Sequence, residues 1–90
     1  MKIKIEKSFE RDVDNITEKK LLLNLQKIIS KLENAKSIHE IPHIKKIKGY
    51  NLFYRIKIGD YRLGLEAVSN QEINLIRFLN RKEVYRYFPH

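Results

Sequence analysis

The segment FYRIKIGDYRLGLE, residues 53–66, carries three cations where the sequence predicts a β-hairpin. Its two-residue turn is expected at Gly59-Asp60, in the type I′ or II′ conformation, because glycine adopts a positive φ without penalty. A turn at that place sets Lys57 directly opposite Arg62, with Arg55 on the same face of the sheet. Like charges directly opposite each other are destabilising, by up to about 1 kcal/mol. The pairing therefore predicts a face that receives an anion.

Alternation along the same hairpin assigns every side chain to one of two faces. Gly64, opposite Arg55, leaves the charged face without a side chain at that point, which is an open floor for the backbone of a ligand. Phe53 and Glu66 complete the charged face. The opposite face is expected to pack in the core and holds Tyr54, Ile56, Ile58, Tyr61, Leu63 and Leu65.

The last predicted strand adds to the charged face. If Ile76 and Phe78 point into the core, alternation turns Arg77 to the charged side. Ile73 and Leu75 have the opposite parity, so the strand carries two conflicting apolar patterns. The assignment of Arg77 to the charged face follows the pattern of Ile76 and Phe78.

Beyond this strand the segment NRKEVYRYF interleaves cations with aromatic rings. That pattern suits RNA, because cations hold phosphates and rings stack on unpaired bases. Tyr85 has two open interpretations, a base-stacking residue or a packing residue, whereas Phe88 is expected to dock a C-terminal helix. The candidate RNA-binding residues of the whole chain are Arg55, Lys46, Lys48, Arg77, Lys82 and Arg86.

The remaining reactive groups give no site of their own. His39 and His43 are four residues apart, but Pro42 between them argues against a metal pair on one helix face, and the chain has no cysteine. Asp12 and Asp14 are expected to be solvated residues on a helix. Neither a glycine-rich phosphate loop nor a nucleophile elbow is present. We therefore expect neither a metal nor a cofactor.

The elements that must position these residues predict one α+β domain over residues 1–90. Their order is β-α-α-β-β-β, with two helices packed on one face of a mainly antiparallel sheet and a short helix at the C-terminus. Ser8 and Thr17 are expected to cap the two helices, and Leu21, Leu25, Ile28 and Leu32 form the apolar stripe of the second. The strands are expected at 1–7, 51–58, 61–68 and 72–79, with a connector at 37–49 and the last helix from near Arg81 to before Pro89.

The formal net charge of +8 on 90 residues indicates a polyanionic partner, either nucleic acid or an acidic protein. A highly charged but inert surface is the alternative, and the uneven spread of the cations disfavours it. No apolar run approaches a membrane span, and the N-terminal MKIKIEKS differs from the apolar core of a signal peptide. With the absence of cysteine, this favours a cytoplasmic protein that has no membrane partner.

The stretch IKGYNLFYRIKIGDYRLGLE, followed by a strand and NRKEVYRYF, resembles the RelE/ParE superfamily of toxins from toxin–antitoxin pairs. In that family an L-x-G element precedes a YRI-x-x-G-x-YR hairpin, and an R-x-x-x-Y element closes the chain. The resemblance covers essentially the whole chain and implies the RelE-like fold and a cognate antitoxin as partner. RelE-like members cleave mRNA in the ribosomal A site without a metal, which implies a nuclease that acts on the ribosome and mRNA.

The resemblance also implies roles for single residues. Arg55 and Lys57 match the paired cations of the first hairpin strand, although the family has lysine where Arg55 stands. Arg62 matches the arginine of the second strand. Arg81 matches the basic residue after the last strand and Tyr85 the C-terminal aromatic residue, at a shorter spacing than in the archetype.

Cleavage by attack of the 2′-hydroxyl needs a base, stabilisation of a dianionic transition state and a proton for the 5′-oxygen. Lys57 is the candidate base, provided that the neighbouring arginine charges favour its neutral form. Arg62 would stabilise the phosphate and Arg81 would act as acid or charge stabiliser. Tyr85 would position or stack on a base. These four residues form the expected catalytic set.

Two other functions fit the same sequence. A ParE-like toxin would bind and inhibit DNA gyrase without nuclease activity. A diverged nucleic-acid-binding domain would have neither activity. The nuclease is favoured by the presence of Arg55, Lys57, Arg62, Arg81 and Tyr85.

Overall fold

The chain folds around a five-stranded sheet in the order β1-β5-β4-β3-β2, as seen in a computed structural model that describes residues 1–89. Strand β1 runs parallel to β5, and every other neighbouring pair is antiparallel. This confirms the α+β fold class, with an N-terminal strand, two helices, a mainly antiparallel sheet and a short last helix. The elements are β1 (Lys2–Ile5), α1 (Lys7–Asp14), α2 (Lys19–Asn34), the 3₁₀ helix η1 (Ile38–Glu40), β2 (Ile44–Lys46), β3 (Phe53–Ile58), β4 (Tyr61–Ser69), β5 (Glu72–Asn80) and α3 (Val84–Tyr87).

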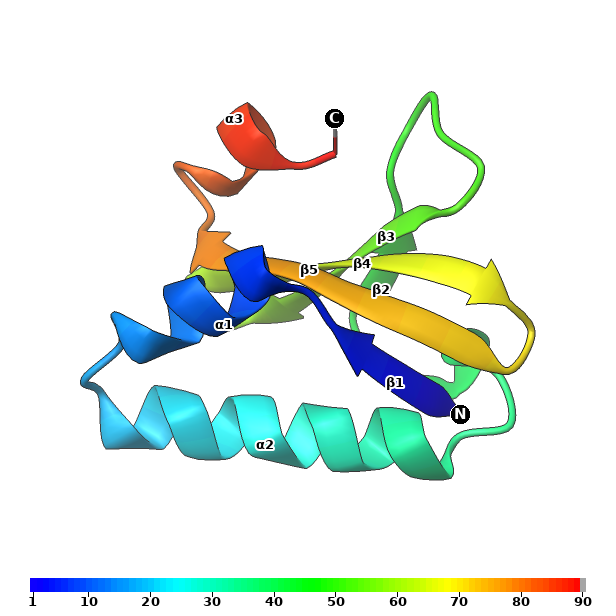
Figure 1. Cartoon of the computed structure of the whole chain (residues 1–90), viewed down its shortest axis with the longest axis horizontal. Helices are drawn as coiled ribbons and strands as arrows, with labels where there is room; N and C mark the ends of the chain where they lie inside the picture. Colours follow the sequence, from blue (N-terminus) through cyan, green and yellow to red (C-terminus); the bar gives the residue numbers. More distant parts are fainter. Residues whose placement is uncertain (90) are drawn as a thin grey trace.

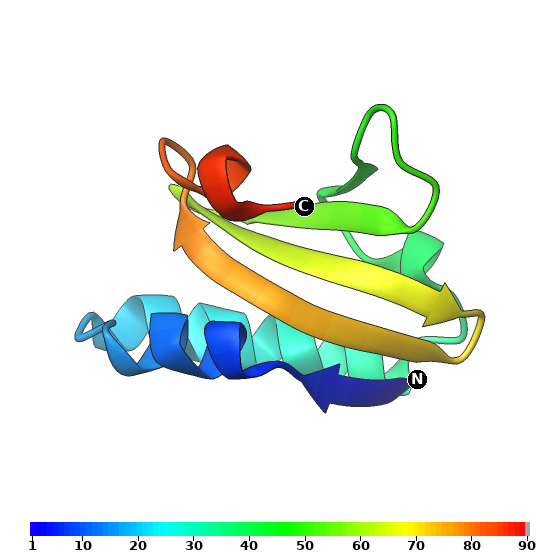
Figure 2. The same ribbon diagram turned by 45° about the horizontal axis from the view of Figure 1, so that its top comes forward.

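The two faces of the sheet carry different layers (Figures 1 and 2). Helix α2 runs along one face, whereas α3 lies on the other. The core fills the space under α2, where Leu21, Leu25 and Leu32 are buried against the sheet. Three residues of the stripe predicted on this helix are therefore confirmed as core, and the fourth, Ile28, is half-buried beside them. The charged face of the hairpin is the face that α2 does not cover.

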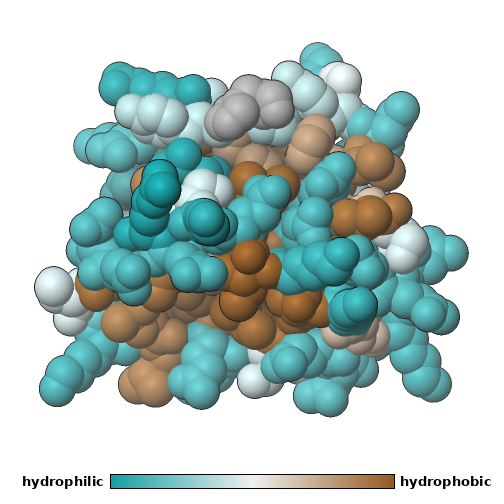
Figure 3. Space-filling model, in the orientation of Figure 1, coloured by the Kyte–Doolittle hydropathy of each residue, from teal (hydrophilic) through white to brown (hydrophobic). Residues whose placement is uncertain are grey.

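In the orientation of Figure 1 most of the visible surface is hydrophilic, and hydrophobic residues gather in its centre, at its lower left and at its upper right (Figure 3). Within residues 1–89, no helix is both long enough and apolar enough to cross a membrane. The large hydrophobic residues that remain exposed are Ile5, Leu23, Tyr50, Leu52, Val68, Tyr85 and Tyr87.

The hairpin of β3 and β4 pairs as its sequence predicts. Lys57 lies opposite Arg62, and Arg55 lies opposite Gly64. At the turn, Gly59 has a φ of 58°. A positive φ at the first central residue, without one at the second, is the pattern of a type II′ turn, so the structure adopts the second of the two expected turn types.

A register shift between β4 and β5 resolves the two conflicting apolar patterns of β5. Gly64 pairs with Arg77, but the next residue of β4 pairs with Leu75, so Ile76 is the extra residue of a bulge. Leu75 and Phe78, on either side of the bulge, are both fully buried. Ile76 is only half-buried, contrary to the expectation that it packs in the core. The expected orientations of Phe78 and Arg77 are confirmed.

The connector predicted at 37–49 contains η1 and β2, which the sequence did not reveal. In η1, the Ser37 hydroxyl accepts from the His39 N–H at 3.2 Å, and the Glu40 carboxylate accepts from the Ser37 N–H at 2.9 Å. Strand β2 pairs antiparallel with β3. Three residues are too few to show an alternating pattern, so its formation depends on the neighbouring strand.

Helix boundaries differ from prediction by a few residues. Helix α2 begins at Lys19 after the N-cap Glu18, so Thr17 does not cap it. Helix α3 begins at Val84 rather than near Arg81, because the intervening residues form a turn.

Helix α1 lies along the edge of β5, at the residues that follow those paired with β1. The Ser8 hydroxyl donates to the carbonyl of Ile76 at 2.6 Å, and the Asp12 carboxylate accepts from the N–H of Phe78 at 2.9 Å. Ser8 is therefore not the N-cap of α1, a position that Glu6 occupies. Asp12 is buried, so its expected role as a solvated residue is wrong, whereas Asp14 is exposed.

Replacing Gly59 by Val should destabilise the hairpin by roughly 1–2 kcal/mol, because a β-branched residue resists a positive φ. A Cβ at this position would have no neighbour within 4 Å, so the substitution tests backbone strain alone. Gly59→Asn is the matched control, since asparagine tolerates a positive φ, and it should cost clearly less. Urea unfolding followed by circular dichroism measures both. Equal losses in the two variants would contradict the turn assignment.

Candidate functional site

The pair Lys57 and Arg62 lies next to the β3–β4 turn on the charged face. Lys57 is exposed and Arg62 is half-buried. The Arg62 Nη1 donates to the carbonyls of Gly59 at 3.0 Å and Tyr61 at 2.9 Å, which holds the guanidinium against the turn. Its Nε and Nη2 donate to no protein acceptor within the described residues. Two sides of the guanidinium therefore remain available for an anion.

A third cation, Arg81, is brought to the same turn by the backbone. Its N–H donates to the carbonyl of Asp60 at 2.7 Å, and its Nε lies 4.0 Å from the Asp60 carboxylate. Both side chains are mostly exposed, and an exposed ion pair of this length contributes little to stability. An incoming phosphate can therefore compete with Asp60 for Arg81. The structure thus gathers Lys57, Arg62 and Arg81 around one turn.

Arg55 lies in β3, farther from the turn than Lys57, and its side chain is held by the residue that precedes the edge strand β2. Its Nη1 donates to the carbonyl of His43 at 2.8 Å. Lys45, which the sequence analysis did not single out, pairs with Arg55 and so shares its face. Lys46 pairs with Tyr54 and therefore points to the opposite face, away from the predicted site. Only the register of β2 could have separated these two lysines.

Arg77 faces the charged side, as expected, but its guanidinium is occupied. It forms two hydrogen bonds with Asp12 of α1, from Nε at 2.8 Å and from Nη2 at 3.0 Å. Its Cζ also lies 5.1 Å from the ring centroid of Tyr87 in α3. Arg77 therefore joins α1, β5 and α3, and it presents little of its charge to solvent. The sequence separation of 65 residues between Arg77 and Asp12 explains why pattern alone did not reveal the pair.

The floor expected at Gly64 is not open. Phe88 lies on it, so closely that a Cβ added to Gly64 would meet the ring at 2.7 Å. Phe88 is buried and packs edge-to-face with Phe53, with ring centroids 5.6 Å apart. The expectation of a ligand backbone at Gly64 is wrong, because the C-terminal segment fills that space. The expectation that Phe88 docks the last helix is confirmed.

Helix α3 is anchored by Val84 and Phe88, both buried, and presents Tyr85 outward with 56% of its surface exposed. Of the two interpretations of Tyr85, this exposure argues against a packing role. Lys82 and Arg86 are also exposed on this segment.

The sequence and the fold of this chain are both similar to those of known proteins. The family model of the ParE toxin of the type II toxin–antitoxin system parDE matches residues 3–85. The chain belongs to the RelE/ParE superfamily of toxins. It is 38% identical over 90 residues to Toxin RelE3 of Methanocaldococcus jannaschii, spanning 99% of this chain and 100% of that protein.

Solved structures agree with the assignment to the RelE/ParE superfamily. The toxin matches a crystal structure of the RelB–RelE antitoxin–toxin complex from Methanococcus jannaschii with a TM-score of 0.80 and 36% identity, covering 96% of this chain and 99% of that one. It also matches a crystal structure of a copper-bound mutant toxin from Helicobacter pylori with a TM-score of 0.66 and 28% identity, covering 92% of this chain and 97% of that one.

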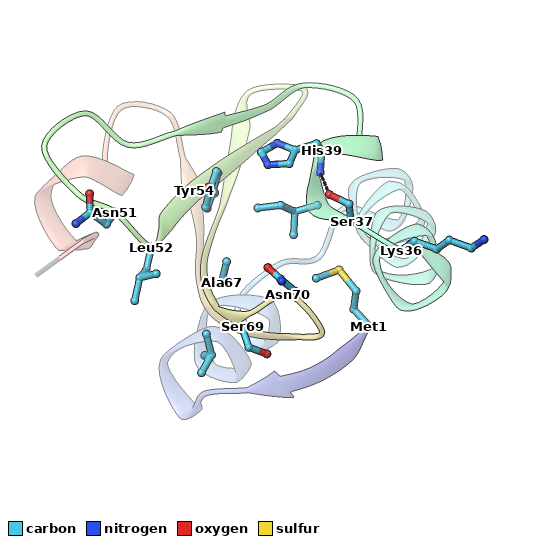
Figure 4. A pocket seen from close by; sticks show the side chains of 12 residues that line it. Met1, Lys36, Ser37, His39, Asn51, Leu52, Tyr54, Ala67, Ser69 and Asn70 are labelled. Atoms are coloured by element: carbon cyan, nitrogen blue, oxygen red, sulfur yellow. Dashed lines mark hydrogen bonds between the residues drawn. The ribbon is translucent and has the colours of Figure 1, made fainter.

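A hollow near the first residues of the toxin lies far from its charged turn. This pocket of about 480 Å³ opens at the end of the sheet distant from Gly59, between the start of β3, the end of β4 and η1 (Figure 4). Met1, Leu52 and Tyr54 contribute to its lining. None of Lys57, Arg62, Arg81 and Tyr85 lines it, so this pocket is not part of the candidate site.

Gly64→Ala should destabilise the toxin by roughly 1–3 kcal/mol, because the added methyl group forces the Phe88 ring out of its place. In a Phe88→Ala background the same change should cost only a few tenths of a kcal/mol, since the clash is gone. A double-mutant cycle by urea unfolding measures this coupling. Additive losses would show that Phe88 does not lie on Gly64.

Proposed function

We propose that this toxin is a ribosome-dependent endoribonuclease that cleaves mRNA in the A site without a metal and so inhibits translation. The observation that carries the proposal is the convergence of Lys57, Arg62 and Arg81 around the β3–β4 turn. Positive groups fixed beside a phosphate stabilise the negative charge that develops during cleavage. Among residues 1–89, the ion pair formed by this cluster is the one between Arg81 and Asp60, so the cluster retains net positive charge for that purpose.

In the proposed reaction the 2′-oxygen bonds to phosphorus and the bond from phosphorus to the 5′-oxygen breaks. The products are a 2′,3′-cyclic phosphate and a free 5′-hydroxyl. One proton leaves the 2′-hydroxyl and one reaches the 5′-oxygen, so the step is balanced without another reactant. Lys57 is the candidate base, because an amine can exist in the neutral form that accepts a proton whereas arginine stays protonated.

The other residues of the set have distinct roles in this proposal. Arg62 offers Nε and Nη2 to the phosphate while Nη1 stays on the turn. Arg81 stabilises the departing 5′-oxygen or supplies its proton. Tyr85, exposed on α3, stacks on or positions a base, because every base has a face on which an aromatic ring can lie.

Inhibition of DNA gyrase by binding is the second candidate function. The observation that favours it is the family match, which is to the ParE toxin. In that case the cations of the charged face would contact an acidic protein surface, and no bond of a nucleic acid would break.

Arg62→Ala should slow single-turnover cleavage of A-site mRNA on purified ribosomes by about a hundredfold or more, because a charge that stabilises the transition state is lost. Lys57→Ala should be comparably severe, and Lys57→Arg should be equally severe if Lys57 accepts the proton. The matched control is Lys27→Ala, which removes one exposed charge from α2 on the other side of the sheet.

The same assay separates the two candidate functions. Circular dichroism confirms that each variant is folded. Wild-type toxin that cuts no mRNA but blocks gyrase supercoiling would overturn the nuclease and favour the second candidate. If Lys57→Arg retains full activity, Lys57 supplies charge rather than a proton acceptor.

We also propose a cognate antitoxin, with an acidic segment that covers the charged face. The related RelE forms a complex with RelB, and a surface of +8 net charge favours a negative complement. Co-expression of the neighbouring small open reading frame should abolish growth arrest. The purified complex should weaken as salt increases, because exposed charge pairs are screened. Growth arrest that continues unchanged would show that this neighbour is not the antitoxin.

A further inference from the structure

The loop between β2 and β3 contains a well-defined turn on the charged side of the sheet. The Tyr50 N–H donates to the carbonyl of Ile47 at 3.2 Å, and Gly49 has a φ of 88°, which suits the third position of a type II turn. The N–H of Ile47 donates to the carbonyl of Phe53 at 2.9 Å and ties the loop to β3. The loop rises from the sheet on the same side as α3 (Figures 1 and 2). These hydrogen bonds fix the backbone of the loop that carries Lys48 and Tyr50 and projects from the sheet.

Aromatic packing fixes Tyr50 on that projection. Its ring packs edge-to-face on Phe53, with centroids 5.5 Å apart at 76°, and Phe53 packs on Phe88 in the same manner. Phe53 shares its face with Arg55 and Lys57 by alternation. Tyr50 is nevertheless 42% exposed. A rigid, exposed ring thus stands on the face that carries the cations.

The chain segment that carries this ring has charges of one sign. Residues 41–59 contain no aspartate or glutamate. The cations of the same segment are Lys45, Lys46, Lys48, Arg55 and Lys57. Lys45 and Arg55 pair with each other on the face of Phe53, between the loop and Lys57. Glu66, which pairs with Phe53, adds one carboxylate to this face, and the cations outnumber it from the loop to the β3–β4 turn, so a polyanion there meets a net positive surface.

We propose that Tyr50 is a second base-stacking site for single-stranded mRNA, with Lys48 as its phosphate contact. The proposal rests on the nuclease function proposed above and extends its substrate site to the opposite end of β3. Phe53 and Lys57 are four residues apart on that strand, a distance of about 13 Å. At about 3.4 Å per stacked nucleotide, a strand of a few nucleotides covers it. Exposed aromatic rings combined with a cationic track are the features that bind unpaired nucleic acid.

The test is single-turnover cleavage on programmed ribosomes at increasing toxin concentration. Tyr50→Ala should raise the half-saturating toxin concentration by about tenfold, as expected for the loss of one stacked base, with little change in the maximal rate. Tyr50→Phe should retain wild-type affinity, because the ring is kept. Tyr50→Leu should behave as Tyr50→Ala, which separates stacking from burial of apolar surface.

Leu52→Ala is the matched control, since Leu52 is an exposed apolar residue of the same loop that lines the pocket near Met1 (Figure 4). It should leave the half-saturating concentration unchanged. In parallel, mRNA carrying 2-aminopurine at successive positions should lose fluorescence on binding at one position outside the cleaved step, and Tyr50→Ala should restore that fluorescence.

The outcomes separate this proposal from the one on which it depends. Wild-type toxin that does not cleave mRNA defeats the nuclease function itself. Active toxin whose affinity for programmed ribosomes is the same with Tyr50→Ala as without it overturns the stacking site alone. If that variant instead loses affinity only for the antitoxin, Tyr50 belongs to a protein interface and the proposal is wrong.

Discussion

The buried carboxylate of Asp12 is the constraint on which the arrangement of the toxin depends. It accepts hydrogen bonds from Nε and Nη2 of Arg77 and from the backbone N–H of Phe78. A charge removed from water is tolerated only with such partners, and loss of one partner from a buried pair typically costs about 3–5 kcal/mol. Through this contact α1 closes the edge of β5 that β1 leaves unpaired. Arg77 then receives the ring of Tyr87 on its other side, which helps to place α3 over the charged face.

The repulsion between Lys57 and Arg62 is relieved without cancelling their charge. Arg62 donates to two backbone carbonyls at the turn, and Arg55 donates to the carbonyl of His43. Carbonyl dipoles orient a guanidinium but carry no net charge, so the face stays positive. Carboxylates in the same places would have given more local stability and a neutral surface. Arg55 and Arg62 therefore keep their positive charge, which is consistent with a face that binds an anionic ligand.

The features that could be predicted from sequence are those set by near neighbours. Gly59 fixes the hairpin register, and the spacing of Leu21, Leu25 and Leu32 fixes the buried side of α2. Contacts across the chain could not be predicted in the same way. Asp12 has the same local sequence character as Asp14, yet only Asp12 meets an arginine. The site was predicted in part, because the hairpin register brings Lys57 and Arg62 together. The Phe88 ring on Gly64 depends on the path of the C-terminal segment. The position of Lys45, rather than Lys46, on the charged face depends on the register of β2.

The pairing of β1 with β5 bears on how the toxin is made. Residues 2–5 pair with residues 72–75, and Asp12 binds Arg77, so both contacts join the N-terminal part of the chain to a strand that is synthesised much later. Domains often begin to fold from the N-terminus during synthesis. Here the first strand and the first helix meet their partners in β5 only after residues 72–78 have been translated. The part of the charged face that β5 and α3 contribute is therefore added after the β3–β4 hairpin has been synthesised.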